Sequence, residues 1–516
     1  MILPLAKSLR VGPSRNSRRL ARERRGMAII VVLMLVSVTL AMSYALMRSQ
    51  MTDVKIQSNS DRRSLARQAA MAGMSIALRK MSEANWTGLD TPATGSLTST
   101  ESYKVTYTTG DPSLTSTSTS YSDYPFRVTL LSTGTSVDPS NSTLSTTYQV
   151  QAVVRLVPRK LGTEETTWQS MQSYTMWLKD VTDPCMVNPP FRIQGNVRLQ
   201  GALTIGSELT WSDTAKARYL QDQNTMRSNG YSDSRIFSGT VFMPTSETSS
   251  TVRSLLTTQY GLTVTNIAST TRAPIVFPTS FSTYRIYPGG KAYTVPTLST
   301  TVAAGTTLAP NVLTNPFGLY FASSGTTIKN NVTIKGTLVS GDDVHLGGTG
   351  IVFTPLDLPA LDGTTAIVRL PGLASAAYCY MDSGATVTFT GVMALRHLFI
   401  ISRGPATMSL TFTGRLIADG LQVYERSDWD YSSSTWTTVY NAFVSNLSLP
   451  LAQRILYMPY YLDGLGLKYQ PILTIKPPDT SISVLQHWQD PTTPFYVVGD
   501  GDAGLRWDLL SWTDMP

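Results

Sequence analysis

The chain has 516 residues and a formal net charge of +8. Eight Lys and Arg residues fall within residues 1–26 beside a single acid, so the rest of the chain is almost neutral, with 34 basic against 33 acidic residues. A neutral body offers no basic surface for phosphates, which argues against a nucleic-acid partner. Three His and two Cys are too few for the usual zinc site. A content of 42% hydrophobic and 15% charged residues indicates a folded chain, neither disordered nor a multi-span membrane protein.

An uncharged segment, Met27 to Met47, follows these basic residues. As a helix its 21 residues would be about 31 Å long, which matches the hydrocarbon core of a bilayer. The nearby positive charge precedes this segment, so we expect a cytoplasmic N-terminus and a body exported to the periplasm or the cell surface. The sequence therefore predicts a single-pass protein of the cytoplasmic membrane.

The helical pattern continues beyond the membrane segment. Residues 48–81 contain no proline, and an apolar stripe recurs at helical spacing in Leu65, Ala69, Ala72 and Ile76. One helix over residues 27–81 would be about 82 Å long, half in the membrane and half amphipathic. Because such a stripe needs a partner, we expect a sheet of the exported body to pack against it.

The N-terminal region resembles type IV pilin-like proteins. The resemblance rests on a basic leader ending in Arg24, Arg25 and Gly26, on the apolar run that starts at Met27, and on the Ala-rich segment 64–74. It is similar in this to PilX-type minor pilins and to the K-type minor pseudopilins of type II secretion. The resemblance implies recognition of the leader at Arg24 and Arg25, and a prepilin peptidase that cuts after Gly26 and methylates Met27. It covers about 60 residues.

One position departs from the major pilins. They resemble one another in a Glu at the fifth mature position, where this chain has Val31. A carboxylate in hydrocarbon is costly unless it is paired, and in the family it is thought to offset the amine of a neighbouring subunit. Its absence implies a minor, initiating or tip subunit. The resemblance implies three partners: other pilin-like subunits, the prepilin peptidase and the inner membrane.

Two other interpretations of the N-terminus remain open. A plain single-pass anchor would show the same hydropathy. A cleaved export signal would use the small residues Ser43 and Ala45, although an apolar run of 21 residues exceeds the usual signal-peptide core.

The region 82–182 is predicted to form an antiparallel β head of the pilin-like α+β type, with Ser/Thr-rich loops. Candidate strands lie at residues 126–131, 148–157 and 168–178. Directly after a long helix, they predict a sheet packed on the amphipathic half of that helix.

A mainly β domain is predicted over residues 183–439. A motif of apolar residue, any residue, Gly, any residue, apolar residue recurs in it, and Thr-Phe-Thr-Gly stands at both 388–391 and 411–414, 23 residues apart. Short strands bent at glycines predict a parallel β-solenoid with an insertion at 211–309; a β-sandwich is the alternative. Residues 440–516 are predicted to cap its end.

The search for catalytic chemistry gives no catalytic set and no cofactor. His345 beside two acids fits a solvated loop, and His397 in an apolar run fits a core position. Asp500 and Asp502 have the spacing that opens some calcium loops, without the Glu that would complete one, so no metal site is predicted. Cys185 and Cys379 would pair only if the fold brings them together, and the sequence leaves this open.

We therefore expect a membrane-anchored pilin-like minor subunit that acts by helix packing and by contacts of its exported domain in a type IV pilus or a type II secretion pseudopilus. We do not expect an enzyme. The alternatives are an exported β-solenoid enzyme acting on polysaccharide and a plain single-pass envelope protein.

Overall fold

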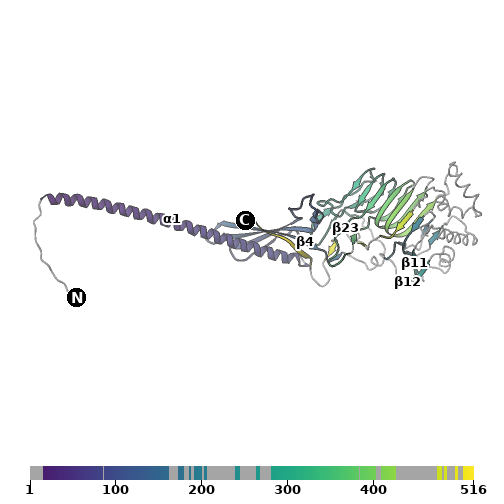
Figure 1. Cartoon of the computed structure of the whole chain (residues 1–516), viewed down its shortest axis with the longest axis horizontal. Helices are drawn as coiled ribbons and strands as arrows, with labels where there is room; N and C mark the ends of the chain where they lie inside the picture. Colours follow the sequence, from purple (N-terminus) through teal and green to yellow (C-terminus); the bar gives the residue numbers. More distant parts are fainter. Residues whose placement is uncertain are drawn as a thin grey trace, which may run out of the picture.

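The computed structural model describes residues 15–84, 86–161, 173–178, 185–187, 191–199, 203–205, 239–244, 263–267, 280–365, 367–382, 384–402, 408–425, 473–478, 482–484, 494–497 and 504–515. Figure 1 shows an elongated molecule: one long helix leads into an antiparallel sheet, and parallel strands stack beyond that sheet. The predicted order, a long N-terminal helix followed by a mainly β domain, is confirmed.

Helix α1 runs without a break from Arg15 to Met81, 67 residues. It therefore begins before the predicted start at Met27 and passes through the Gly26–Met27 peptide bond. The side chains of residues 27–57 are exposed, whereas the last turns are packed on the head sheet. Thus α1 has a free half and a docked half, as Figure 1 shows.

The head sheet has five antiparallel strands in the order β1-β2-β3-β4-β31. Their bounds are β1 Ala93–Ser96, β2 Glu101–Thr109, β3 Arg127–Asp138, β4 Asn141–Val157 and β31 Arg506–Met515, with the 3-10 helix η1 at Tyr121–Phe126 between β2 and β3. Alternate residues of β3 are buried on the face that meets α1, the pattern expected of a strand covered on one face.

Two expectations about this sheet need correction. The C-terminal residues, predicted to cap the β domain, instead form β31, which pairs with β4 at the edge of the head sheet. The strand expected at 168–178 is described only as β6, Met176–Leu178, and β6 pairs outside the head. The head is thus closed by the end of the chain, and the residues between β4 and β31 form an insertion into its sheet.

The inserted residues form three columns of parallel strands. The first column contains β17 Leu319–Ala322, β20 Thr337–Ser340, the start of β25 Leu373–Met381, the middle of β26 Thr386–Ser402 and of β27 Ser409–Glu425, then β6, β9 Val197–Leu199, β11 Thr240–Pro244 and β12 Thr263–Ile267. The second contains β15 Thr301–Val302, β18 Thr326–Ile328, β21 Val344–Leu346, the ends of β25, β26 and β27, then β7 Cys185–Val187 and β10 Leu203–Ile205. The third contains β16 Thr307–Leu308, β19 Thr333–Lys335, β22 Ile351–Thr354, the starts of β26 and β27, β28 Leu473–Lys476 and β8 Phe191–Ile193.

The spatial order of this stack differs from the order of the chain. β27 and β28, late in the sequence, pair with β6, β7 and β8, which come directly after the head. The chain therefore enters the stack in its interior, builds outward to β12, and returns to build the other part from β15 to β28. β11 and β12 also show that the predicted insertion at 211–309 contributes strands to the stack.

One hydrophobic core joins the three columns. It contains Leu338 of the first column, Val344 and Leu346 of the second, and Ile351 and Phe353 of the third. The opposite face of the first column is buried too, in a second core shared with the head, the hairpin β13 Thr283–Arg285 with β14 Ala292–Thr294, and the strands β23 Asp357–Leu358, β24 Ile367–Arg369 and β30 Tyr496–Val497. Two further short strands pair with these: β29 Ile482–Val484 with β24, and β5 Lys160–Leu161 with β30. Head and stack are therefore packed together.

The repeated Thr-Phe-Thr-Gly segments lie side by side. Thr388 pairs with Thr411, Phe389 with Phe412 and Gly391 with Gly414, as the spacing of the two copies predicts. Gly391 has φ 104°, and a Cβ on Gly414 would lie 1.6 Å from the Gly391 carbonyl oxygen. The glycines are required because neighbouring backbones meet there.

We expect Gly414→Val to destabilise this part of the stack by about 3 kcal/mol, because the clash is with backbone and cannot be relieved by a side chain. Limited proteolysis of the full chain, followed by mass spectrometry, should show faster cleavage within residues 386–425. The neighbouring Thr413→Val is the control, since Thr413 is half-buried and has no such contact. Equal cleavage rates for the two variants would contradict the steric explanation.

Candidate functional site

Most of the exposed large apolar side chains of the described residues lie in the free half of α1. Met27 is 65% exposed, Val31 51% and Leu40 65%, and residues 27–47 carry no charge. The helix is long and apolar enough to cross a membrane, with a mean hydropathy of 2.5 over its best 18-residue window. The hydroxyls of Ser37 and Thr39 donate to carbonyl oxygens four residues earlier, so these polar groups are satisfied without water.

The docked half of α1 lies unusually close to the sheet. A Cβ on Gly134 of β3 would be 2.0 Å from the Ala66 carbonyl oxygen and 2.4 Å from the Ala70 nitrogen. Beside it, the Ser132 hydroxyl donates to the Ala70 carbonyl over 2.7 Å in a buried position. Gly73 of the helix is required for a similar steric reason, because a Cβ there would lie 2.7 Å from the Tyr103 ring. The Ala-rich composition of this segment thus has a physical reason: only small residues permit this approach.

The predicted stripe coincides only in part with the buried face. Ala69 is fully buried and Ala72 and Ile76 are half-buried, but Leu65 is 39% exposed. The described contact runs through Ala66, Ala69, Ala70, Gly73, Met74, Ala77 and Met81. The prediction that Leu65 packs on the sheet is therefore wrong. The smaller Ala66, the next residue of the helix, takes that place because helix and sheet approach so closely.

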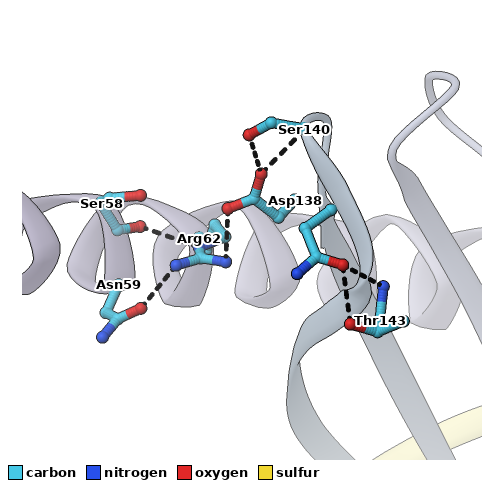
Figure 2. A network of polar contacts seen from close by, with 7 residues as sticks. Ser58, Asn59, Arg62, Asp138, Ser140 and Thr143 are labelled. Atoms are coloured by element: carbon cyan, nitrogen blue, oxygen red, sulfur yellow. Dashed lines mark hydrogen bonds and ion pairs between the residues drawn. The ribbon is translucent and has the colours of Figure 1, made fainter.

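A polar clamp fixes the point where α1 leaves the head. Figure 2 shows Arg62 donating to Asp138, at the tip of the β3–β4 hairpin, over 3.0 Å, to the Asn59 side chain and to the Ser58 carbonyl. Asp138 in turn accepts hydrogen bonds from the backbone and hydroxyl of Ser140. These hydrogen bonds, together with the charge of Arg62, hold the pKa of Asp138 below its usual value. An open recess of about 380 Å³ lies between the hairpin tip and the helix at this clamp.

We expect the clamp to be lost in acid. Because the pKa of Asp138 is lowered in the folded state, its contribution is present above its unfolded pKa of about 3.9 and disappears as the pH falls through the folded value. Hydrogen–deuterium exchange around residues 136–143 should therefore be faster in Asp138→Asn than in the unchanged chain at pH 7. That difference should vanish once the pH has fallen below the lowered, folded-state pKa of Asp138. A difference that persists in acid would show that the charge of Asp138 is not responsible.

The remaining predicted site residues lie apart from this region. Arg24, Arg25, Gly26 and Met27 lie within α1, whereas Asp500 and Asp502 are outside the described residues. Among the described residues, no group of three or more His, Cys, Asp and Glu is placed to hold a metal ion.

The strand pairings answer the question about Cys185 and Cys379 that the sequence left open, because they keep the two residues apart. Gln422 pairs with Met186, which places Cys185 opposite Leu421; Leu421 pairs with Leu398, and Leu398 with Cys379. The two cysteines are therefore three strands apart, about 14 Å, whereas a disulfide needs Cα atoms within about 7 Å. Cys379 is a free, buried thiol whose pKa is raised by burial.

The two histidines of the stack belong to a ladder of stacked rings. His345 stacks on Tyr380 at 4.8 Å between ring centroids, and Tyr380 on Phe399 at 5.3 Å. His345 Nδ1 also lies 3.6 Å from an Asp382 oxygen. His397 is 4% exposed and adjoins Tyr378. Since the rings cover one another's faces along the stack, the ladder serves packing between successive strands.

Two parts of the site were missed from the sequence. Gly134 sits in the middle of an otherwise alternating strand, a position that marks close approach of another backbone. β31 alternates Trp507, Leu509 and Trp512 with polar residues, a strand pattern that was assigned to a cap.

No protein-family model matches the sequence, and none of the curated proteins does. Among solved structures, the chain is similar to the competence-associated pilin ComZ from Thermus thermophilus, at 11% identity over 88% of this chain and 97% of that chain, with a TM-score of 0.17.

Proposed function

We propose that this chain is a membrane-anchored minor subunit of a pilin-like filament, either a type IV pilus or a type II secretion pseudopilus. One observation carries the proposal: a single helix is uncharged and exposed over residues 27–47, while its other end is docked through Ala and Gly residues on an antiparallel sheet. A membrane can cover the free half before assembly, and the helices of neighbouring subunits can cover it afterwards.

The exported body is proposed to act through contacts. We infer that the three columns of parallel strands close into a β-solenoid, because side chains from all three meet in one core. A stack of this size inserted into the head sheet would crowd a filament in which every subunit carried one. This supports a minor position at or near the tip, as does Val31 in place of the Glu found in major pilins.

We propose association rather than catalysis, with no cofactor. The chain's partners would be other pilin-like subunits, the inner membrane and a prepilin peptidase that cuts between Gly26 and Met27 and methylates Met27. The leader residues Arg24 and Arg25 would keep the N-terminus in the cytoplasm until then.

The proposal is tested by the intact mass and N-terminal sequence of the protein from membranes of its own host. A chain that begins at methylated Met27 is expected. A start near Leu46 would indicate a cleaved export signal and a soluble exported protein, and an uncut chain would indicate a plain anchor; either result overturns the proposal.

We further expect Gly26→Val to block processing. The variant should keep all 26 leader residues. Val31→Ala, which also exchanges one uncharged residue of the same helix for another, should be processed normally. Mass spectrometry of the two variants checks this. Normal trimming of Gly26→Val would exclude cleavage after residue 26.

A further inference from the structure

The head sheet is wider than the helix that covers it. An α-helix is about 10 Å across and neighbouring strands lie about 4.8 Å apart, so one helix covers about two to three strands. α1 lies over β2, β3 and β4, and β31 lies on the outer side of β4. The outer strip of the sheet therefore extends beyond the helix.

Apolar side chains of β31 point to the helix side of this strip. Leu509 pairs with Val154 and Trp512 with Ala152, and both partners are almost completely buried beneath α1. Residues directly opposite in a sheet share a face. Nevertheless Leu509 is 53% exposed and Trp512 37%, and Leu510, at the irregularity between them, is 45% exposed.

The facing side of α1 continues the same surface. Arg67 reaches across to Asp514 of β31 over 2.6 Å, which identifies the helix face that borders the strand. Met71, one turn further along that face, is 38% exposed. We call the three residues Met71, Leu509 and Trp512 the β31 shelf. Edge strands are usually protected by Lys or Pro, and the stretch Leu509 to Thr513 contains neither.

We propose that the β31 shelf docks the uncharged N-terminal helix of a neighbouring pilin-like subunit. This inference rests on the proposed function. Length fits: β31 spans about 34 Å, and an uncharged helix like residues 27–47 of this chain is about 31 Å long. Charge fits as well. The five residues between Asp508 and Asp514 are uncharged, and the charges beside them are paired, Asp508 with Arg506 and Asp514 with Arg67. An uncharged helix can therefore cover the strand without burying an unpaired ion.

The orientation of α1 agrees with this occupant. The shelf adjoins the docked half of α1, so a helix placed there would run beside α1 and pack against it as well as against the sheet. Van der Waals packing is one of the means by which uncharged helices associate. The partner's helix would thus complete the layer that α1 begins.

The test is photo-cross-linking in membranes of the native host. A photoreactive amino acid replaces Trp512 in the full chain, and cross-linked peptides are identified by mass spectrometry. We expect attachment to the uncharged N-terminal helix of another prepilin-type protein. Thr513 is the matched control: it is exposed on the same strand, and it pairs with Gln151 on the opposite face of the sheet, so it should give no such product.

A second probe at Val38, in the free half of α1, separates the two proposals. Cross-links from Val38 to pilin-like subunits without any from position 512 would overturn the shelf and leave the proposed function standing. Absence of pilin-like products from both positions would overturn both. Cross-links from position 512 to a second copy of this chain, or to a protein without a prepilin-type helix, would also overturn the shelf.

An independent test introduces a charge into the shelf and measures how much of the partner co-purifies. Trp512→Asp should reduce the amount of the pilin-like partner that co-purifies with the full chain by about tenfold, because an aromatic anchor is replaced by an ion. Thr513→Asp should leave it unchanged. Both positions are exposed, so neither variant is expected to unfold the head; equal recovery of the partner by both would contradict the proposal.

Discussion

Gly134→Leu is expected to separate α1 from the head sheet. The new Cβ would lie 2.0 Å from the Ala66 carbonyl oxygen and 2.4 Å from the Ala70 nitrogen, and both are backbone atoms of the helix. Side-chain rearrangement cannot relieve this contact, so the helix must move away and expose Met74 and Ala77. We expect the docked helix to lose about 4 kcal/mol of stability.

Hydrogen–deuterium exchange of the detergent-solubilised full chain measures this effect. Peptides from residues 66–81 should exchange about a thousandfold faster, which corresponds to about 4 kcal/mol. Gly134→Ala should lose nearly as much, since the clash already begins at Cβ. Thr135→Leu, on the other face of β3, is the control. If residues 66–81 exchange at the same rate in Gly134→Leu and in Thr135→Leu, the close approach of helix and sheet does not hold the head together.

The helix was the part that the sequence predicted best. Its uncharged run and the absence of proline through Met81 determine a continuous helix from local properties alone. Which residues meet the sheet could not be predicted from the apolar stripe, because the choice depends on how closely two backbones approach. Leu65 is one of the two large apolar residues of that stripe and is exposed; Ala66 beside it is buried.

The stack was predicted in its local repeat but not in its order. Register between the two Thr-Phe-Thr-Gly segments follows from their spacing of 23 residues. The pairing of Leu416 with Met176 joins segments far apart in the chain, and no local pattern specifies it. The pairing of β31 with β4 is of the same kind. Long-range pairings decide which end of the chain closes each sheet, so sequence periodicity alone assigned β31 to the wrong body.

The C-terminal strand links three parts of the molecule. Trp507 donates its indole N–H to the Met81 carbonyl at the end of α1 over 3.1 Å. Its ring meets Trp86 at 5.9 Å and Tyr287 of the segment between β13 and β14 at 5.2 Å, both edge to face. Because β31 follows the whole stack in the sequence, the head sheet can reach its full width only after the stack has been synthesised.

A chain truncated after Leu505 lacks β31, so its head sheet should be incomplete. Loss of Trp507 alone removes a large packed side chain, which costs about 3–5 kcal/mol, and the truncation also removes the Arg67–Asp514 ion pair and the outer hydrogen bonds of β4. Exchange in β4 and in residues 66–81 should rise by at least about a hundredfold. Peptides of β19 and β22 should keep their protection, because these strands pair with other strands of the stack.

Trp507→Ala in the complete chain distinguishes packing from strand pairing. This variant should lose much of the protection from exchange near Met81 and Trp86, while the amides of β4 that pair with residues 511–515 stay protected. If truncation leaves β4 and the docked helix as protected as in the full chain, the head is complete without β31, and the last strand is an accessory to the sheet. If the stack loses protection together with the head, the two bodies fold as one cooperative unit through the core they share.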